Sequence, residues 1–245
     1  MKTAYEALKK EINRKSKKAD QDQCCFGERC FPFMENLYIA AREQLAACER
    51  IALESKVAGK SYFLFANRIA RSRPINIDLF DSGNDKAFGI FRRILEGKRH
   101  ELTSAEITRS IYIVAMTCCA GRDVSSKGDQ KTPGTIFEWL CAAIVRACLN
   151  VNPVRALQVL NLDMKGDLPT DFVFDLGAEK PKFHLPVKTS TRERIIQVWA
   201  HQRVLDGVYG VGRFLAMPII LTETKLDSKK LEVVEICLPW QWRLY

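Results

Sequence analysis

Asp171 and Lys188 are the two side chains in this sequence best suited to joint chemistry. Each lies in a strand-like segment, residues Asp171–Leu176 and Phe183–Lys188, and the sequence GAEKPK between them favours a turn. If this turn joins a hairpin, Asp171 lies opposite Lys188, and a carboxylate meets an ammonium group at one sheet edge. Asp175 lies four residues further along, about 13 Å at strand rise, so Asp171 is the better partner.

Such a pair suits metal-assisted hydrolysis of a phosphodiester bond. The carboxylate would bind Mg²⁺, which activates a water molecule and neutralises the charge that develops on the phosphate. The lysine would stabilise or orient that water. The alternative is a cross-strand Asp–Lys pair on the surface, worth under about 1 kcal/mol, and the expected geometry does not separate the two.

The residues around this pair resemble the PD-(D/E)xK nuclease superfamily and, within it, type II restriction endonucleases. Pro169-Thr170-Asp171 opens one strand and Lys188 closes the next. The sequence KTSTRERIIQ that follows is similar to the helix entry of a subgroup of restriction enzymes that cut within short palindromic sites. The resemblance covers roughly residues 134–222, and residues 1–133 share none of it.

The resemblance implies a role for each matching residue. Asp171 is expected to bind Mg²⁺ together with the carbonyl of Val187, and Lys188 is expected to act on the water or the transition state. Glu138, in the helix before the first strand, stands where many such nucleases carry a supporting acid. The expected DNA contacts near the following helix are Arg192 and Arg194, for the scissile-strand phosphate, and Gln197.

Two positions depart from the superfamily pattern. The second acid of (D/E)xK would stand at position 186, which is Pro186. In the resembling subgroup that acid is displaced into the following helix, 13–14 residues after the lysine, where this chain has His201 and Gln202. Glu193 is a possible substitute, but it also completes a helix capping box. The sequence leaves open whether Gln202, Glu193 or Glu138 replaces the missing acid.

The elements that must position these residues form an α/β core after a helical N-terminal region. A helix is expected at 136–148 and another at 191–205; strands are expected at 155–162, 171–176, 183–188, 214–222 and 231–238. The resulting α-β-β-β-α-β order predicts a restriction-endonuclease-like mixed sheet.

The N-terminal half has helical periodicity at 3–18, 35–56, 61–71 and 85–96, and a capping box opens a further helix at 103–119. Residues 121–135 are polar and rich in glycine, so we expect a loop there, in which Lys127 and Lys131 either contact the DNA backbone or are simply solvated. We predict a helical region of residues 1–132 for dimerisation and DNA contacts, followed by a nuclease core of residues 133–245.

Composition sets the class of partner and the compartment. Lys and Arg number 38 against 29 Asp and Glu, a net charge of +9 that favours a polyanionic partner. The nine cysteines are an odd number, and no apolar segment follows the charged N-terminus, so reduced thiols in a cytoplasm fit best. The longest apolar run, Phe214–Leu221, is too short to span a membrane. Of the three histidines, His184 is expected to be packed and His100 solvated.

Together these features predict a type II restriction endonuclease, a Mg²⁺-dependent homodimer that cuts double-stranded DNA, with a cognate DNA methyltransferase as a possible partner. One alternative is a repair or recombination nuclease on the same core. Another is a non-catalytic DNA-binding protein on a degenerate core, which Pro186 and the missing helix acid favour.

Overall fold

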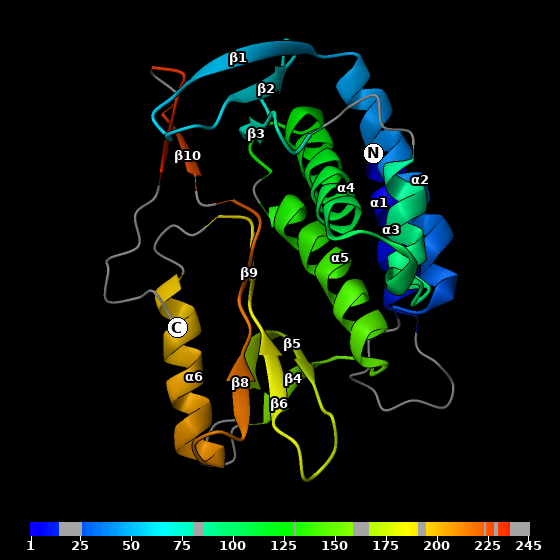
Figure 1. The fold of residues 1–245 in the computed structure, drawn as a ribbon, viewed down its shortest axis with the longest axis vertical. Helices are drawn as coiled ribbons and strands as arrows, with labels where there is room; N and C mark the ends of the chain where they lie inside the picture. Colours follow the sequence, from blue (N-terminus) through cyan, green and yellow to red (C-terminus); the bar gives the residue numbers. More distant parts are fainter. Residues whose placement is uncertain are drawn as a thin grey trace.

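The structure is a computed structural model that describes residues 1–14, 26–80, 86–129, 131–158, 167–190, 195–222, 224–227 and 230–235. Five helices pack together in its N-terminal half (Figure 1). They are α1 (Lys2–Ile12), α2 (Phe31–Ala46), α3 (Ala87–Leu95), α4 (Ser104–Ser125) and α5 (Lys131–Leu149), with two short 3₁₀ turns at Glu28–Cys30 and Arg99–Glu101. The predicted capping box is present at the start of α4, where Thr103 and Glu106 bond each other's backbone N–H groups.

The glycine-rich segment at residues 121–135 is largely helical, so the predicted loop is wrong for most of its length. Helix α4 continues to Ser125 and α5 begins at Lys131. Gly121 lies against α2, where an added Cβ would be only 2.8 Å from the Cβ of Ala41. This glycine therefore allows two helices to approach closely, and it does not mark a chain break.

The predicted helical region of residues 1–132 also contains strands, which corrects that prediction. They are β1 (Glu49–Ser55), β2 (Tyr62–Ala66) and β3 (Ile75–Asn76). All five residues of β2 are buried, with Phe63 and Phe65 in the main core and the alternate side chains in a smaller core on the other face. A short aromatic segment that is buried on both faces is stable as a central strand, despite its apparent helical periodicity.

These strands form one sheet with the last strands of the chain, in the order β10-β11-β1-β2-β3. Strand β10 (Thr224–Asp227) pairs antiparallel with β11 (Glu232–Glu235), and β11 pairs parallel with β1. The boundary predicted between residues 132 and 133 falls inside α5. The C-terminal strands therefore complete a sheet that begins in the N-terminal half.

A second, mixed sheet carries the predicted active-site residues. Strands β4 (Val154–Gln158), β5 (Asp167–Phe174) and β6 (Lys182–Leu185) are antiparallel, and β8 (Phe214–Ala216) pairs parallel with β6. Beyond Pro186, β7 (Val187–Lys188) and β9 (Ile219–Ile220) continue this parallel pairing. Helix α6 (Ile195–Tyr209) connects the two parallel segments, so the predicted α-β-β-β-α-β order is confirmed.

The two faces of this sheet pack against different helices (Figure 1). Alternate residues of β5, Phe172 and Phe174, belong to the main core with α5. Val173, between them, packs with Leu205 of α6 and Phe214 of β8. Because side chains alternate along a strand, the odd-numbered residues of β5 face α6, and Asp171 is one of them.

Helix α5 is long and apolar enough, by length and composition alone, to cross a membrane. Half of its most apolar window is buried inside the protein, however, and Ile136, Trp139 and Leu140 belong to the main core. Burial between the other helices and the sheet therefore accounts for its apolar composition.

Candidate active site

The structure brings Asp171 and Lys188 into direct contact, as the sequence predicted. The Nζ of Lys188 donates a hydrogen bond to Oδ2 of Asp171 at 2.8 Å. The predicted register is wrong by two residues, however, because Phe172 pairs with Leu185 and Asp171 therefore lies opposite Pro186. A shift of two residues leaves every side chain on its original face, so Lys188 still reaches the carboxylate.

Pro186 interrupts the strand pairing next to Asp171 and so allows the contact between Asp171 and Lys188. Proline has no N–H to donate to β5, and the pairing of β5 with β6 ends at Leu185. The N–H of the next residue, Val187, donates to Oδ2 of Asp171 at 2.8 Å in place of a backbone carbonyl. In extended backbone the N–H and C=O of one residue point to the same side, so the Val187 carbonyl also lies toward Asp171.

Glu138 of α5 is electrostatically coupled to this pair. Burial raises the pKa of its carboxyl group to about 7, and the negative charge of Asp171 adds to the rise, while Lys188 opposes it. Two carboxylates that influence each other in a half-buried setting are a common feature of sites that bind cations. Glu138 therefore senses the charges of Asp171 and Lys188, and its role as a supporting acid stays a prediction.

Asp171 and Lys188 line a cleft of about 300 Å³ between the sheet and α6. Gln197, at the start of α6, is exposed and lines the same cleft, and its contact with DNA stays a prediction. His184 of β6 and His201 of α6 also line it. His201 was not predicted as a site residue, although it lies one helical turn after Gln197 and therefore on the same helix face.

The displaced acid is expected at position 201 or 202, and only one of these two residues lines the cleft. His201 lines it, whereas Gln202 bonds strand β8. The Gln202 amide donates to the Phe214 carbonyl at 2.9 Å and accepts from the Ala216 N–H at 2.9 Å. Gln202 therefore joins α6 to β8, and its side-chain atoms are committed to that contact.

The remaining predicted site residues lie apart from the pair or outside the described residues. Arg192, Arg194 and Glu193 lie outside them. Lys127 is exposed in the short connection between α4 and α5, and Lys131 is exposed at the first residue of α5. The charge of Lys131 contributes to the electrostatic environment of Glu138, so Lys131 belongs to the surroundings of the site.

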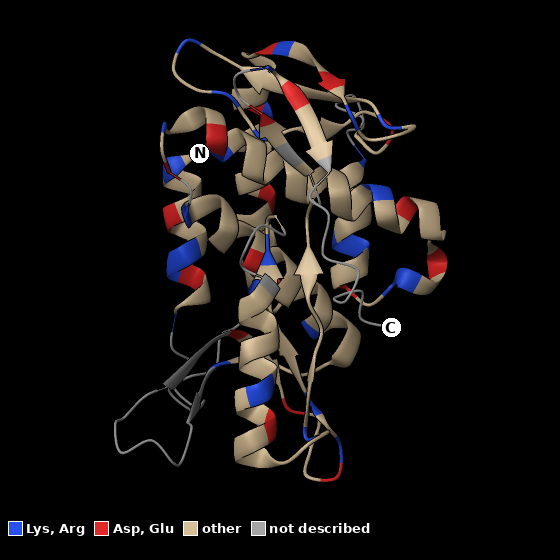
Figure 2. Ribbon diagram, turned by 90° about the vertical axis from the view of Figure 1, so that its left-hand side faces the viewer, with Lys and Arg blue, Asp and Glu red and all other residues tan. Residues whose placement is uncertain are grey.

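Two arginines of the N-terminal half form ion pairs within the fold. Arg73 forms an ion pair with Asp123 at 2.8 Å, with both side chains largely buried. Arg93 pairs with Glu101, and basic and acidic segments lie next to each other along the helices in Figure 2.

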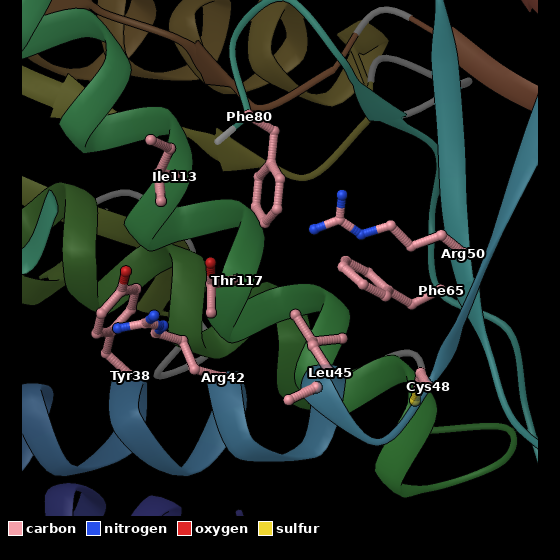
Figure 3. Close-up of a pocket in the computed structure, with 10 residues that line it drawn as sticks. Tyr38, Arg42, Leu45, Cys48, Arg50, Phe65, Phe80, Ile113 and Thr117 are labelled. Atoms are coloured by element: carbon pink, nitrogen blue, oxygen red, sulfur yellow. The ribbon is translucent and has the colours of Figure 1, made fainter. Parts of the chain in front are cut away.

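A second cavity, of about 260 Å³, lies between α2, α4 and the β1–β2 hairpin (Figure 3). Its wall contains Arg42, Arg50, Phe65 and Phe80, and none of its lining residues is acidic. This cavity therefore differs from the cleft beside Asp171, whose lining includes a carboxylate.

The donor atoms in the cleft suit an oxygen-binding cation. Asp171 lines the cleft with a carboxylate, and carboxylate oxygens are ligands that Mg²⁺ prefers. Glu138 does not line it, but its raised pKa shows that it is close enough to sense the charge of Asp171. Among the described residues no three His, Cys, Asp or Glu side chains are grouped as a complete metal site. An ion here would therefore keep several water ligands, as Mg²⁺ commonly does.

Comparison with known proteins defines the class of fold: the chain has a restriction-endonuclease-like fold. The similar solved structure is that of the type IIP restriction endonuclease Kpn2I, with a TM-score of 0.75 and 24% sequence identity over 98% of this chain and 82% of that chain. No family model and no curated protein matches the sequence.

Proposed function

We propose that this protein is a type II restriction endonuclease that hydrolyses phosphodiester bonds of double-stranded DNA at a specific sequence, with Mg²⁺ as cofactor. The observation that carries the proposal is the contact of Lys188 with Asp171 at 2.8 Å inside a cleft. The similarity to Kpn2I, a type IIP restriction endonuclease, supports the same class of activity.

The proposed roles follow from the position of each group. Asp171 and the Val187 carbonyl would hold the ion, and Glu138 would support it directly or through water. When bound, Mg²⁺ would act as a Lewis acid and lower the pKa of an attacking water. Lys188 would orient that water and stabilise negative charge on the phosphate, and Gln197 would contact the DNA at the mouth of the cleft.

The wider assembly is also proposed. A homodimer would match the two-fold symmetry of a palindromic DNA site, and a cognate methyltransferase in the same cytoplasm would protect host DNA. Arg192, Arg194, Lys127 and Lys131 would contribute phosphate contacts, whose strength falls with salt.

The test is incubation of the purified protein with long double-stranded DNA and Mg²⁺. We expect discrete fragments, with ends that identify one recognition sequence, and we expect Asp171→Asn to abolish them. Asp175→Asn is a matched control, because Asp175 lies at the end of the same strand and pairs with Lys182 at 2.6 Å. Fragments that persist at full yield with Asp171→Asn would refute the assignment.

Two other outcomes would identify the alternatives. Cleavage directed by flaps or junctions, without a fixed sequence, would indicate a repair or recombination nuclease. Pro186 at the acid position, and the lack of a group of three metal-binding side chains among the described residues, favour a non-catalytic DNA-binding protein as the second candidate. That protein would bind DNA with a strong salt dependence and would not cut it in Mg²⁺ or Mn²⁺.

A further inference from the structure

The cleft contains two histidines that the proposed function does not use. His184 lies on β6 and His201 on α6, so the two rings come from opposite walls. Their ring centres are 5.9 Å apart, and the ring planes are inclined by 40°. Two imidazoles that approach each other across a cleft are a recurring arrangement for binding metal ions.

His184 has an unusual environment for a buried polar residue. Its side chain is 1% exposed, and among the described residues neither ring nitrogen has a hydrogen-bond partner. A buried polar group without a partner destabilises a fold, and such a group in a folded protein requires an explanation. A ligand that enters the cleft would supply the missing partner.

We propose that His184 and His201 together bind one divalent transition-metal ion, such as Zn²⁺, Co²⁺ or Ni²⁺, with water completing its coordination. With metal–nitrogen bonds of about 2.1 Å, two imidazoles on one ion have ring centres roughly 5–6 Å apart. The observed separation of 5.9 Å lies in this range.

The charge state of the pair supports metal binding. Burial and the neighbouring His201 lower the pKa of His184 to about 4, with Asp171 opposing and Lys188 adding to the shift. Burial and Lys188 also lower the pKa of His201, against the effect of Asp171. Both rings are therefore neutral near pH 7, and each has a lone pair available without loss of a proton.

The imidazole pair differs in chemistry from the oxygen donors beside it. Imidazole nitrogens favour Zn²⁺, Co²⁺ and Ni²⁺, whereas carboxylate and carbonyl oxygens favour Mg²⁺. His201 is only partly buried, which gives an ion access to the pair from solvent. This site goes beyond the proposed function, because it would bind metal in the absence of DNA and whether or not DNA is cut.

The chain offers a matched control, because it contains only three histidines. The third, His100, lies on the short turn at Arg99–Glu101, with its side chain 76% exposed. A single exposed histidine can bind transition metals weakly, so His100→Ala measures that background. His201→Ala is the informative variant, because it removes one ligand from a partly exposed position without opening the core.

The experiment titrates Co²⁺ into the metal-free protein without DNA and follows visible absorption, with Zn²⁺ calorimetry for the stoichiometry. We expect one tightly bound ion per chain, apart from any weaker ion at the oxygen donors of Asp171. His100→Ala should bind it unchanged, and His201→Ala should bind it at least about tenfold more weakly, a loss that even outer-shell partners of a metal can produce. Binding that is unchanged in His201→Ala would overturn the proposal. So would intense sulfur-to-cobalt bands that account for all of the bound ion, because the ligands would then be cysteines.

Histidine side-chain NMR on the wild-type protein avoids any variant that fails to fold. Paramagnetic Co²⁺ should shift the signals of His184 and His201 and leave that of His100 nearly unchanged; shifts confined to His100 would also overturn the proposal. DNA cleavage is measured separately with Mg²⁺. Intact Co²⁺ binding without cleavage would refute only the proposed nuclease function, and cleavage without Co²⁺ binding would refute only the imidazole site.

Discussion

Strands β5 and β6 position two Asp–Lys ion pairs that have the same chemistry and different surroundings. Asp171 and Lys188 approach to 2.8 Å, with side chains 21% and 19% exposed. Asp175 and Lys182 approach to 2.6 Å at the other end of the strands, with side chains 48% and 39% exposed. The distance between charges therefore does not distinguish a candidate active site from a surface ion pair.

The neighbours of each pair make the distinction. Asp175 accepts from the Gly177 N–H at 2.9 Å in the turn, and its hydrogen bond from Lys182 lowers the pKa of its carboxyl group. These interactions satisfy Asp175 locally and stabilise the turn. Asp171 also accepts a backbone N–H, but it lines a cleft and raises the pKa of a second carboxyl group, that of Glu138.

The largest expected effect is on DNA cleavage by lysine variants of the two pairs. Lys188→Ala should lower the cleavage rate by about 10²–10³-fold, the loss typical when one group that stabilises transition-state charge is removed. Lys182→Ala should leave the rate within about twofold, because its side chain interacts only near the turn. Single-turnover cleavage of a duplex that contains the recognition sequence measures both, and equal losses would end the distinction between the pairs.

The contact between Asp171 and Lys188 could be predicted because it follows from local rules. Strand alternation and the turn sequence place the two residues at one end of a hairpin, and the structure confirms that they meet. The register could not be predicted, because it depends on how Pro186 ends the pairing of β5 with β6. A shift of two residues leaves each side chain on the same face of the sheet. Asp171 and Lys188 therefore meet as predicted, although the predicted register is wrong.

The errors in the N-terminal half have a common physical cause. Residues Tyr62–Ala66 form a strand because both of their faces are covered, and Gly121 lies within a helix because α2 packs close to it. Both outcomes depend on contacts with segments far away in the sequence. The aromatic composition of Tyr62–Ala66 was the available signal for a strand, whereas Gly121 offered none.

The second-largest expected effect is on the stability of the metal-free protein and its dependence on pH. The pKa of Glu138 is about 7 in the folded protein and 4.5 as its ordinary value, so the fold binds the proton more tightly than the unfolded chain does. Ionisation therefore lowers stability progressively from about pH 4.5 to 7, and the full cost of about 3 kcal/mol applies above pH 7. Glu138→Gln should raise the free energy of unfolding by up to that amount at pH 8 and change it little at pH 4.5.

Urea unfolding at the two pH values measures this difference. Glu179→Gln is the matched control, because Glu179 is exposed in the turn beside the Asp175–Lys182 pair, and its removal should change stability little at either pH. An equal gain from Glu138→Gln at pH 4.5 and pH 8 would mean that the gain comes from packing. Burial would then not destabilise the ionised form of Glu138. The raised pKa of Glu138 would no longer support its position in a buried environment beside Asp171.

The smallest expected effect is the coupling energy within each ion pair, measured by double-mutant cycles. The Asp171–Lys188 pair is the less exposed, and a hydrogen bond to a charged group there should contribute about 1.5–3 kcal/mol. The exposed Asp175–Lys182 pair should contribute about 0.2–1 kcal/mol and lose most of it in high salt, because surface charges are screened. If both couplings were equal and equally sensitive to salt, the cleft would not shield its ion pair from solvent. Burial could then no longer explain why only the Asp171–Lys188 pair is expected to support cleavage.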